Sequence, residues 1–249
     1  MNIGVCAAYP VGRELTEFIV NYGHPIKFIA TLAEDTTYSP YIERECINHG
    51  IPYIHGANVN SPELIQTIKD NDIDIMFLLW WPTIVHKEAL DAAKIGWVNL
   101  HPSLLPYGRG KHPYYWAINE GTPYGVTIHF IDESVDGGAI IAQREIPYDI
   151  TDTGETLYVR ALAEIVALFK DAYPKIMTGV ASVMVEGGNV HYAKDLRWHS
   201  DIALDESYKA RDLINRIRGR TFLQGDSAHF YENGKKYRIR VIIEECGDV

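Results

Sequence analysis

The sequence has few cysteines and no spacing typical of a metal site. Its three cysteines among 249 residues are Cys6, Cys46 and Cys246, and no two of them form a CxxC pair. An odd, scattered set argues against a disulfide framework and a thiolate zinc site, and it fits a reducing compartment. No HExxH-like spacing of His, Asp and Glu occurs either. We therefore expect a cytoplasmic protein without a metal centre.

Long apolar runs and an excess of positive charge are also missing. No run approaches the ~18–20 apolar residues of a membrane span, and MNIGVCAAYPVGRE reaches a charged residue too early for a signal peptide. The formal net charge is −10, whereas a nucleic-acid surface needs clustered Lys and Arg to neutralise phosphates. We expect neither a membrane nor a nucleic-acid partner. A small basic pocket for one or two phosphates remains compatible with this charge.

The two commonest nucleotide cradles are absent as well. No GxGxxG follows the first strand-like run, and no GxxxxGK[ST] occurs anywhere in the chain. A Rossmann-like sheet without them need not bind NAD or ATP, so the function has to be argued from the site.

Short apolar runs alternate with helical patterns in the first hundred residues. Strands are predicted at 1–9, 26–33, 51–56, 73–81 and 95–101, and helices at 12–23, 39–50, 61–72 and 85–94. This alternation predicts an α/β fold with a Rossmann-like, mostly parallel sheet and helices on both faces. Ligands of such sheets bind beyond the carboxyl ends of the strands.

The pattern changes after residue 106. Helices are predicted at 113–121, 153–179 and 205–220, strands at 124–132, 139–149 and 188–194, and a hairpin at 228–245. Asn233-Gly234 is the strongest short hairpin signal. We place a boundary near residue 195, between a main domain, 1–195, and a small helix and β-hairpin subdomain, 196–249.

Residues 97–106 read WVNLHPSLLP, in which an amide and an imidazole follow a strand-like run. Asn99 and His101 are two residues apart, so on a strand their side chains leave the same face. A hydrogen-bond donor beside an acid/base group at the end of a strand is an arrangement suited to catalysis.

The stretch NLHPSLLPYGRG, which begins at Asn99, resembles the signature of the 10-formyltetrahydrofolate-dependent formyltransferases, where Asn-x-His-Pro-Ser-Leu-Leu-Pro ends a central strand. The resemblance continues through Pro113 and Trp116 to GVTIHFIDESVDGGAIIAQREI, which is similar to the family's second motif. It implies a formyltransferase catalytic domain over residues 1–195, with 10-formyltetrahydrofolate as cosubstrate.

The resemblance implies catalytic roles for Asn99, His101 and Asp136. Asn99 would donate an N–H to the oxyanion that forms on the formyl group, a contact typically worth ~3–4 kcal/mol of barrier. His101 would face that oxygen if protonated or accept the amine proton if neutral. Asp136 would orient or charge-stabilise His101, and the division of acid/base work between them stays open. Asp132 competes for the carboxylate role, but the Asp-Gly-Gly context favours Asp136.

The segment LLWWPTIV, residues 78–85, corresponds to the loop that lines the family's pterin pocket. The resemblance implies cofactor contacts from Trp80, Trp81, Pro82, Ile84, Val85 and Asp132. Pro82 stands where relatives often have Gly after an aromatic, which affects the conformation expected for the loop. Asp132 would shape the neighbouring loop around the pterin. The alternative, that one or both tryptophans belong to the core, stays open.

Candidate acceptor contacts follow the catalytic strand and lie in the tail. Arg109 and Lys111 in YGRGK suit phosphate or carboxylate groups, although a solvated turn is the alternative. The tail resembles that of bacterial sugar N-formyltransferases, which implies that Phe222, and less directly Phe230 or Tyr231, could stack on a nucleotide base; packing within the hairpin is the alternative.

Together these features predict an N-formyltransferase that acts on the amino group of a UDP-, dTDP- or GDP-linked amino-deoxysugar for surface glycan synthesis. The alternatives are another amine (glycinamide ribonucleotide, methionyl-tRNA or an amino acid) and a non-catalytic folate-binding domain. The expected partners are small molecules, and the resemblance implies a homodimer. The sequence does not name the sugar, the position of its amine or the base.

Overall fold

The computed structural model describes residues 1–179, 182–225 and 227–247. The chain forms two compact units: unit 1 comprises 1–101, 127–143 and 164–185, and unit 2 comprises 102–126, 144–163 and 186–249. Three of the five limits between the units fall within β7 (Gly125–Phe130), β8 (Ile140–Glu145) and α6 (Gly154–Thr178).

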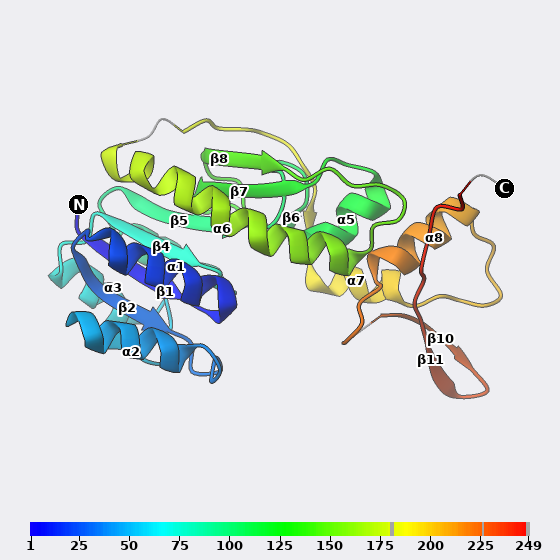
Figure 1. Ribbon diagram of the computed structural model, residues 1–249, viewed down its shortest axis with the longest axis horizontal. Coiled ribbons are helices and arrows are strands. Elements are labelled where there is room, and N and C mark those ends of the chain that lie inside the picture. The colour runs from blue at the N-terminus through cyan, green and yellow to red at the C-terminus, as the bar shows by residue number, and fades with distance from the viewer. Residues whose placement is uncertain (180–181, 226, 248–249) are drawn as a thin grey trace. The chain divides into compact units, whose positions relative to one another are not determined.

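A mostly parallel sheet organises unit 1 (Figure 1). Its strands up to residue 101 are β1 (Ile3–Ala7), β2 (Ile26–Thr31), β3 (Tyr53–Ile54), β4 (Ile75–Leu79) and β5 (Gly96–His101). The helices between them are α1 (Tyr9–Tyr22), α2 (Ser39–His49), α3 (Pro62–Asp70) and α4 (Lys87–Leu90). The strand order is β3-β2-β1-β4-β5-β7-β8, and β7 runs antiparallel to β5. The predicted α/β fold is therefore confirmed.

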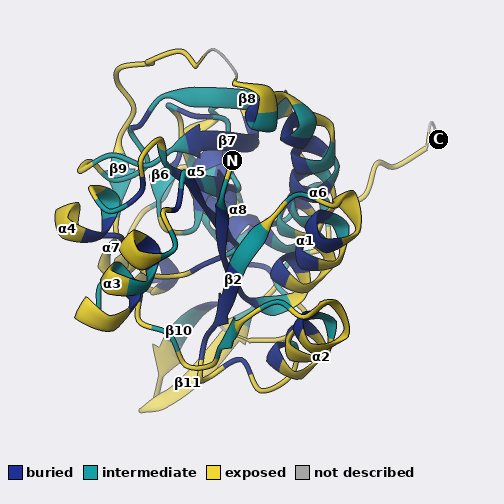
Figure 2. Cartoon of the chain, turned by 90° about the vertical axis from the view of Figure 1, so that its left-hand side faces the viewer, coloured by how far each residue is buried: buried dark blue, intermediate teal, exposed yellow. Residues whose placement is uncertain are grey.

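Helices cover both faces of this sheet, whose central strands are buried (Figure 2). On one face, Phe77 of β4 contacts Phe169 of α6, which in turn packs edge-on against Phe18 of α1. On the other face, Met76 and Trp97 belong to an apolar core shared with α3 and α4. The near-continuous apolar run of β4 is explained by this two-sided burial.

The helix predicted over 85–94 is much shorter in the structure, where α4 covers only Lys87–Leu90. The chain turns back because the Lys94 and Ile95 amides donate to the carbonyls of Ile73 and Asp74, at 3.1 and 2.8 Å. These bonds bring the chain to the start of β5, and tertiary contact thereby overrides the local helical pattern.

The described residues of unit 2 form two short strand pairs and three helices that lie wholly within this unit. These elements are β6 (Arg109–Gly110), α5 (Pro113–Glu120), β9 (Val190–His191), α7 (Ala193–Ser200), α8 (Ala210–Gly219), β10 (Ala228–Glu232) and β11 (Lys235–Ile239). The predicted hairpin is confirmed: β10 and β11 are antiparallel, and Asn233 and Gly234 have φ values of 49° and 75°, as a type I′ turn requires. The sequence patterns did not predict β6 or α7.

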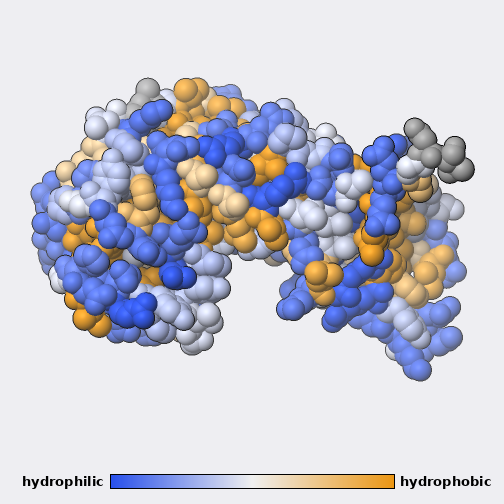
Figure 3. Space-filling view, viewed as in Figure 1, coloured by the Kyte–Doolittle hydropathy of each residue, from blue (hydrophilic) through white to orange (hydrophobic). Residues whose placement is uncertain are grey.

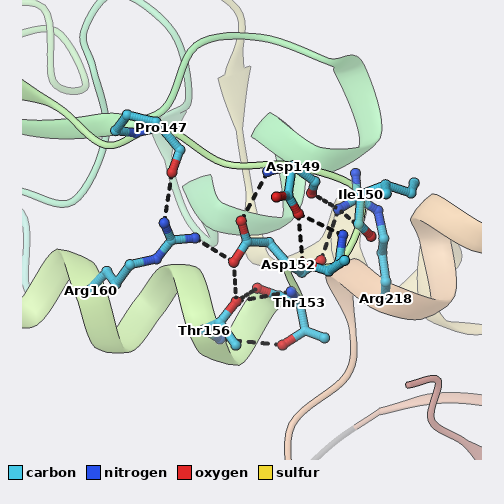
Figure 4. Close-up of polar contacts among 9 residues, drawn as sticks. Pro147, Asp149, Ile150, Asp152, Thr153, Thr156, Arg160 and Arg218 are labelled. Atoms are coloured by element: carbon cyan, nitrogen blue, oxygen red, sulfur yellow. Dashed lines mark hydrogen bonds and ion pairs between the residues drawn. The ribbon is translucent and has the colours of Figure 1, made fainter. Parts of the chain in front are cut away.

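Two arginines hold the loop between β8 and α6 in unit 2 (Figure 4). Arg218 of α8 donates from Nη1 to the carbonyls of Asp149 and Asp152, each at 2.8 Å. Arg160 of α6 donates to the Pro147 carbonyl at 2.6 Å and forms an ion pair with Asp152. The Arg218 side chain is buried, and its Nη1 is satisfied by backbone oxygens.

Candidate active site

The ends of β5 and β7 place Asn99, His101 and His129 together in unit 1. In the antiparallel register Asn99 lies opposite His129, and His101 lies opposite Thr127. Strand alternation puts Asn99 and His101 on the same face, as predicted. His101 is buried and Asn99 is half-buried.

Hydrogen bonds define the protonation state of His129. Its Nδ1 lies 2.7 Å from the Phe130 carbonyl and therefore carries the proton, so Nε2 is the acceptor. The Asn99 amide nitrogen lies 3.2 Å from that Nε2 and donates to it. Burial lowers the pKa of His129 to about 4, and the charge of Asp136 only partly offsets this effect. His129 is consequently a neutral residue that orients the Asn99 amide and leaves its second N–H for another acceptor.

Asp136 approaches both imidazoles from the loop that follows β7. Its carboxylate oxygens lie 3.6 Å from His101 Nδ1 and 3.8 Å from His129 Nε2. These separations suit electrostatic interaction but exceed normal hydrogen-bond lengths. The backbone of Asp136 has a φ of 46°, in the left-handed region that is costly for residues other than Gly and is found most often at functional sites.

The conformation of this loop depends on Asp132 and Gly138. Asp132 Oδ1 accepts from the amide and the hydroxyl of Ser134, at 2.8 and 2.6 Å. A Cβ on Gly138 would lie 2.0 Å from the Phe130 carbonyl oxygen, so no larger residue fits there. The predicted role of Asp132 in shaping the loop agrees with these bonds, whereas ligand contact by Asp132 remains a prediction.

A small cavity of about 70 Å³ opens beside this cluster. Its walls are formed by Leu78, Trp81, Thr83, Ile84, Val85, Asn99, His129, Ile131, Asp132, Ser134, Val135 and Asp136. Pockets for drug-sized ligands usually measure about 300–1,000 Å³. A ligand of that size would require the walls to move apart, and Ile84, a wall residue that is 66% exposed, is only lightly packed.

The two predicted tryptophans have different positions. Trp81 is buried in the apolar core, lines the cavity and donates from its indole nitrogen to Thr83 Oγ1 at 2.8 Å. Trp80 is half-buried with a φ of 65°, and neither it nor Pro82 is among the residues that line the cavity. Val85 is a buried wall residue.

Asn60 supports the cavity wall, although no sequence pattern indicated it. Its amide nitrogen donates to the Ile84 carbonyl at 2.9 Å, and its amide oxygen accepts from the His86 backbone at 2.7 Å. The side chain thus pairs with the backbone on both sides of Val85 and holds the segment that carries two wall residues.

The predicted acceptor residues belong to unit 2. Arg109 is half-buried in β6 and donates to the Gly187 carbonyl at 3.2 Å, while Lys111 is exposed. The Phe222 ring packs against Tyr114 and Tyr158, with centroids 5.3 and 6.4 Å away.

The other two aromatic candidates lie in the hairpin. Phe230 stacks on Tyr237 of the facing strand at 5.3 Å, which is cross-strand packing, and Tyr231 is exposed.

The position at which Rossmann folds bind phosphate is filled by a carboxylate of this chain. Buried Asp35 accepts from the Tyr9 amide, at the start of α1, at 2.7 Å and from the Tyr38 amide at 3.1 Å. Because the N-terminus of α1 already has an anionic partner, a ligand phosphate is not needed there. This agrees with the lack of a glycine-rich turn.

The described part of the chain holds neither a metal-binding cluster nor a membrane-spanning helix. Between residues 1–179, 182–225 and 227–247, no three His, Cys, Asp or Glu side chains are grouped so as to hold a metal ion. No helix in these ranges combines the length and apolarity needed to cross a bilayer.

Comparison with known families matches two parts of the chain. Residues 39–172, more than half of the sequence, match the family model described as formyl transferase. The chain belongs to the formyl transferase family. Residues 195–245 of this family member also match the N-formyltransferase dimerization C-terminal domain.

Relatives of this formyl transferase include proteins of different lengths. A methionyl-tRNA formyltransferase of Geobacillus thermodenitrificans is 32% identical over 181 residues, which are 72% of this chain but only 56% of that relative. A sugar N-formyltransferase from a Shewanella species has a TM-score of 0.80 at 23% identity, with 99% of both chains covered.

A third relative was solved with ligands. The formyltransferase PseJ from Anoxybacillus kamchatkensis, in complex with a UDP-linked 4-formamido sugar and tetrahydrofolate, has a TM-score of 0.60 at 24% identity. The match covers 88% of this chain and 98% of PseJ. At such identities the structural matches show a shared fold.

The low pKa of His129 predicts acid-sensitive folding of this formyl transferase. The unfolded chain binds a proton near pH 6.5, whereas folded His129 resists it down to about 4, so stability rises with pH between these values. About 3 kcal/mol present above pH 6.5 is lost as the pH falls towards 4. Thermal unfolding of His129→Gln should depend less steeply on pH in this window than wild type, and an unchanged slope would contradict the prediction.

Proposed function

We propose that the protein transfers a formyl group from 10-formyltetrahydrofolate to the amino group of a nucleotide-linked amino-deoxysugar. The observation that carries this proposal is the buried cluster at the end of β5, where Asn99, His101, His129 and Asp136 are brought together beside a cavity. A module that only binds folate has no need of an oriented amide next to an imidazole and a carboxylate.

Each residue of the cluster has a task in formyl transfer. Asn99, held by His129, directs its second N–H to the formyl oxygen as negative charge develops there. His101 accepts the proton of the attacking amine and can pass it on towards the leaving nitrogen. Asp136, whose carboxylate lies 3.6 Å from His101 Nδ1, would orient the imidazole for this transfer.

The residues around the cavity fit a pterin. Trp81, Val85, Ile131 and Val135 provide apolar walls for a flat ring. The Asp132 carboxylate in the same wall can accept from ring N–H groups. The ring enters only when the wall segment near Ile84 moves outward, because the cavity of about 70 Å³ is too small for it. Bound folate would present its formyl group to Asn99.

Two observations support a nucleotide sugar as acceptor. The Shewanella sugar N-formyltransferase matches nearly the whole chain, including the C-terminal part, and PseJ was solved with a UDP-linked sugar. A second candidate is methionyl-tRNA, favoured by the 32% identity to the Geobacillus enzyme. The net charge of −10 opposes tRNA binding.

An acceptor panel tests both candidates. The full chain would be incubated with 10-formyltetrahydrofolate and UDP-, dTDP- and GDP-linked amino sugars, glycinamide ribonucleotide, charged initiator tRNA or a free amino acid, and products read by mass spectrometry. We expect the mass of one formyl group on a nucleotide sugar. Formylation of tRNA alone would show that methionyl-tRNA, and not a nucleotide sugar, is the acceptor. Folate binding without any formylated product would show that the protein is a binding module and not an enzyme. We propose a cytoplasmic location for this activity.

We also propose a homodimer built through residues 195–245. Apolar side chains lie on the surface of the C-terminal part of the chain (Figure 3). Trp198, Leu223 and Ile242 are 80%, 78% and 85% exposed, and exposed groups of this kind mark protein interfaces. The match to a dimerization domain covers the same residues.

Trp198→Glu should convert the dimer to a monomer in light scattering coupled to size exclusion, because a charge would be buried at the interface. Trp198→Phe, which stays apolar, is the matched control and should remain dimeric. A wild-type protein that is monomeric at all concentrations would refute the dimer.

A further inference from the structure

Two buried arginines near the end of α8 have opposite surroundings. Arg218 and Arg220 are 5% and 6% exposed. Arg218 is satisfied by three carbonyls and by Asn215 Oδ1, at 2.8 Å from its Nε, as Figure 4 shows for the carbonyls of the loop. Arg220 Nε is buried and makes no hydrogen bond. Among the described residues no acid reaches the Arg220 guanidinium within ion-pair distance, and no oxygen accepts from its side chain.

The environment of Arg220 is itself positive and aromatic. Burial, followed by the charges of Arg220 and Lys111, lowers the pKa of His112 to about 4, which places both cations near this imidazole. Helix α5 starts next to His112 and has no side-chain N-cap bond. The positive partial charge at the N-terminus of α5 therefore adds to the charges of Arg220 and Lys111. Tyr114 in the first turn of α5 is also close enough for Arg220 to influence its pKa, which burial raises to about 12.

A buried donor without an acceptor, such as Arg220 Nε, is energetically costly. Buried charges in proteins are almost always paired, because desolvation costs several kcal/mol per ion. The sequence has acids to spare, with 33 Asp and Glu against 23 Lys and Arg, yet none of the acids that the structure describes forms an ion pair with Arg220. An anionic group of a bound ligand would supply the partner that Arg220 lacks among the described residues. The planar guanidinium matches the paired oxygens of phosphate and carboxylate groups.

We propose that Arg220 binds an oxyanion of a small-molecule ligand, and specifically the diphosphate of the nucleotide-linked acceptor. This assignment rests on the proposed function for its choice of ligand. Phosphate is favoured over a carboxylate because Phe222, two residues further on, forms an aromatic group with Tyr114 and Tyr158. A cation beside aromatic rings suits a nucleoside diphosphate, whose base can lie on a ring while its phosphates pair with the cation.

Calorimetric titration of the full chain with UDP and with dTDP tests the site. Arg220→Gln should weaken binding of the preferred nucleotide at least about 30-fold, as expected for loss of a buried charged partner. Arg220→Lys should recover only part of the loss, since it keeps the charge but not the fork. Affinity for 5-formyltetrahydrofolate should be unchanged in both variants.

Thermal unfolding without ligand separates a binding role from a structural one. Arg220→Met should raise the melting temperature or leave it unchanged, because an unpaired buried charge is removed. Arg218→Met is the matched control, similarly buried but with Nε and Nη1 hydrogen-bonded, and it should lower the melting temperature by several degrees. UDP should raise the melting temperature of wild type and not that of Arg220→Met.

Four outcomes would overturn the proposal. Arg220→Met could melt as early as Arg218→Met, which would make Arg220 structural. Arg220→Gln could lose 5-formyltetrahydrofolate instead of UDP, assigning the site to a folate carboxylate. Arg220→Gln could dissociate the dimer, which would show that the partner of Arg220 is an acidic side chain of a second copy of the chain. Wild type could bind inorganic phosphate as tightly as UDP, or neither nucleotide at millimolar concentration. If no sugar is formylated but Arg220 still controls nucleotide binding, the proposed function fails while the anion site stands.

Discussion

His101→Ala is expected to lower kcat by a factor of about 10²–10⁴, the usual contribution of a positioned acid/base group. The imidazole is buried at the end of β5, and its Nδ1 lies 3.6 Å from Asp136. Without it the amine proton has no acceptor held at that point. Single-turnover kinetics with the acceptor found in the panel would measure the loss, while affinity for 5-formyltetrahydrofolate should change little, since His101 is not among the residues that line the cavity.

Two further variants make this result interpretable. His101→Asn keeps a polar side chain and a similar fold but no titrating group, so it should be as slow as the alanine variant. Asp136→Asn keeps the size of the carboxyl and removes its charge, and it should reduce kcat less than loss of the imidazole does. Full turnover in His101→Asn would show that another residue moves the proton.

Asn99→Ala is expected to lower kcat about 10²–10³-fold, the measured cost of removing one oxyanion donor in other enzymes. The Asn99 amide is aligned by His129, which accepts one of its hydrogens at 3.2 Å. The other hydrogen is available to the formyl oxygen because Asn99 also lines the cavity. The same kinetic assay applies, and KM for the acceptor should change less than kcat, because the contact strengthens only as charge develops.

Asn99→Asp and His129→Gln distinguish the role of the Asn99 amide donor from that of His129, which orients it. Asn99→Asp retains the shape but replaces the donor by a negative oxygen, so it should be at least as slow as Asn99→Ala. His129→Gln leaves the donor in place with weaker alignment and should lose less activity. If Asn99→Asp kept most of the turnover, the amide would have no role in stabilising charge.

Much of the fold was predictable because its information is local. Strand–helix alternation through residue 101 predicted β1 to β5, and Asn233-Gly234 predicted the hairpin at β10 and β11. The errors occurred where tertiary contacts, and not the local sequence pattern, determine the secondary structure. The helix at 85–94 was cut short by hydrogen bonds to Ile73 and Asp74. The two-residue strand β6 exists only because β9, about 80 residues later, pairs with it, and no local pattern carries that information.

The candidate site divides in the same way. Asn99 and His101 could be placed on one face from their spacing, and the family motif suggested Asp136. No local pattern marks His129, because only the register of β5 and β7 shows that it lies opposite Asn99. Asn60 gave no signal at all, since its role depends on contact with a segment 24 residues away.

By itself, the sequence determined the fold class, the hairpin and the pair of polar residues at the end of β5, because these follow from periodicities of two and 3.6 residues and from local turn chemistry. The tertiary structure alone decided which polar groups are partnered. The stretch RGR, residues 218–220, contains two arginines of equal local character, Arg218 and Arg220, yet one donates to the carbonyls of a loop almost 70 residues away and the other meets no acceptor among the described residues. Partners of this kind are set by long-range packing, which leaves no trace in the pattern around either residue.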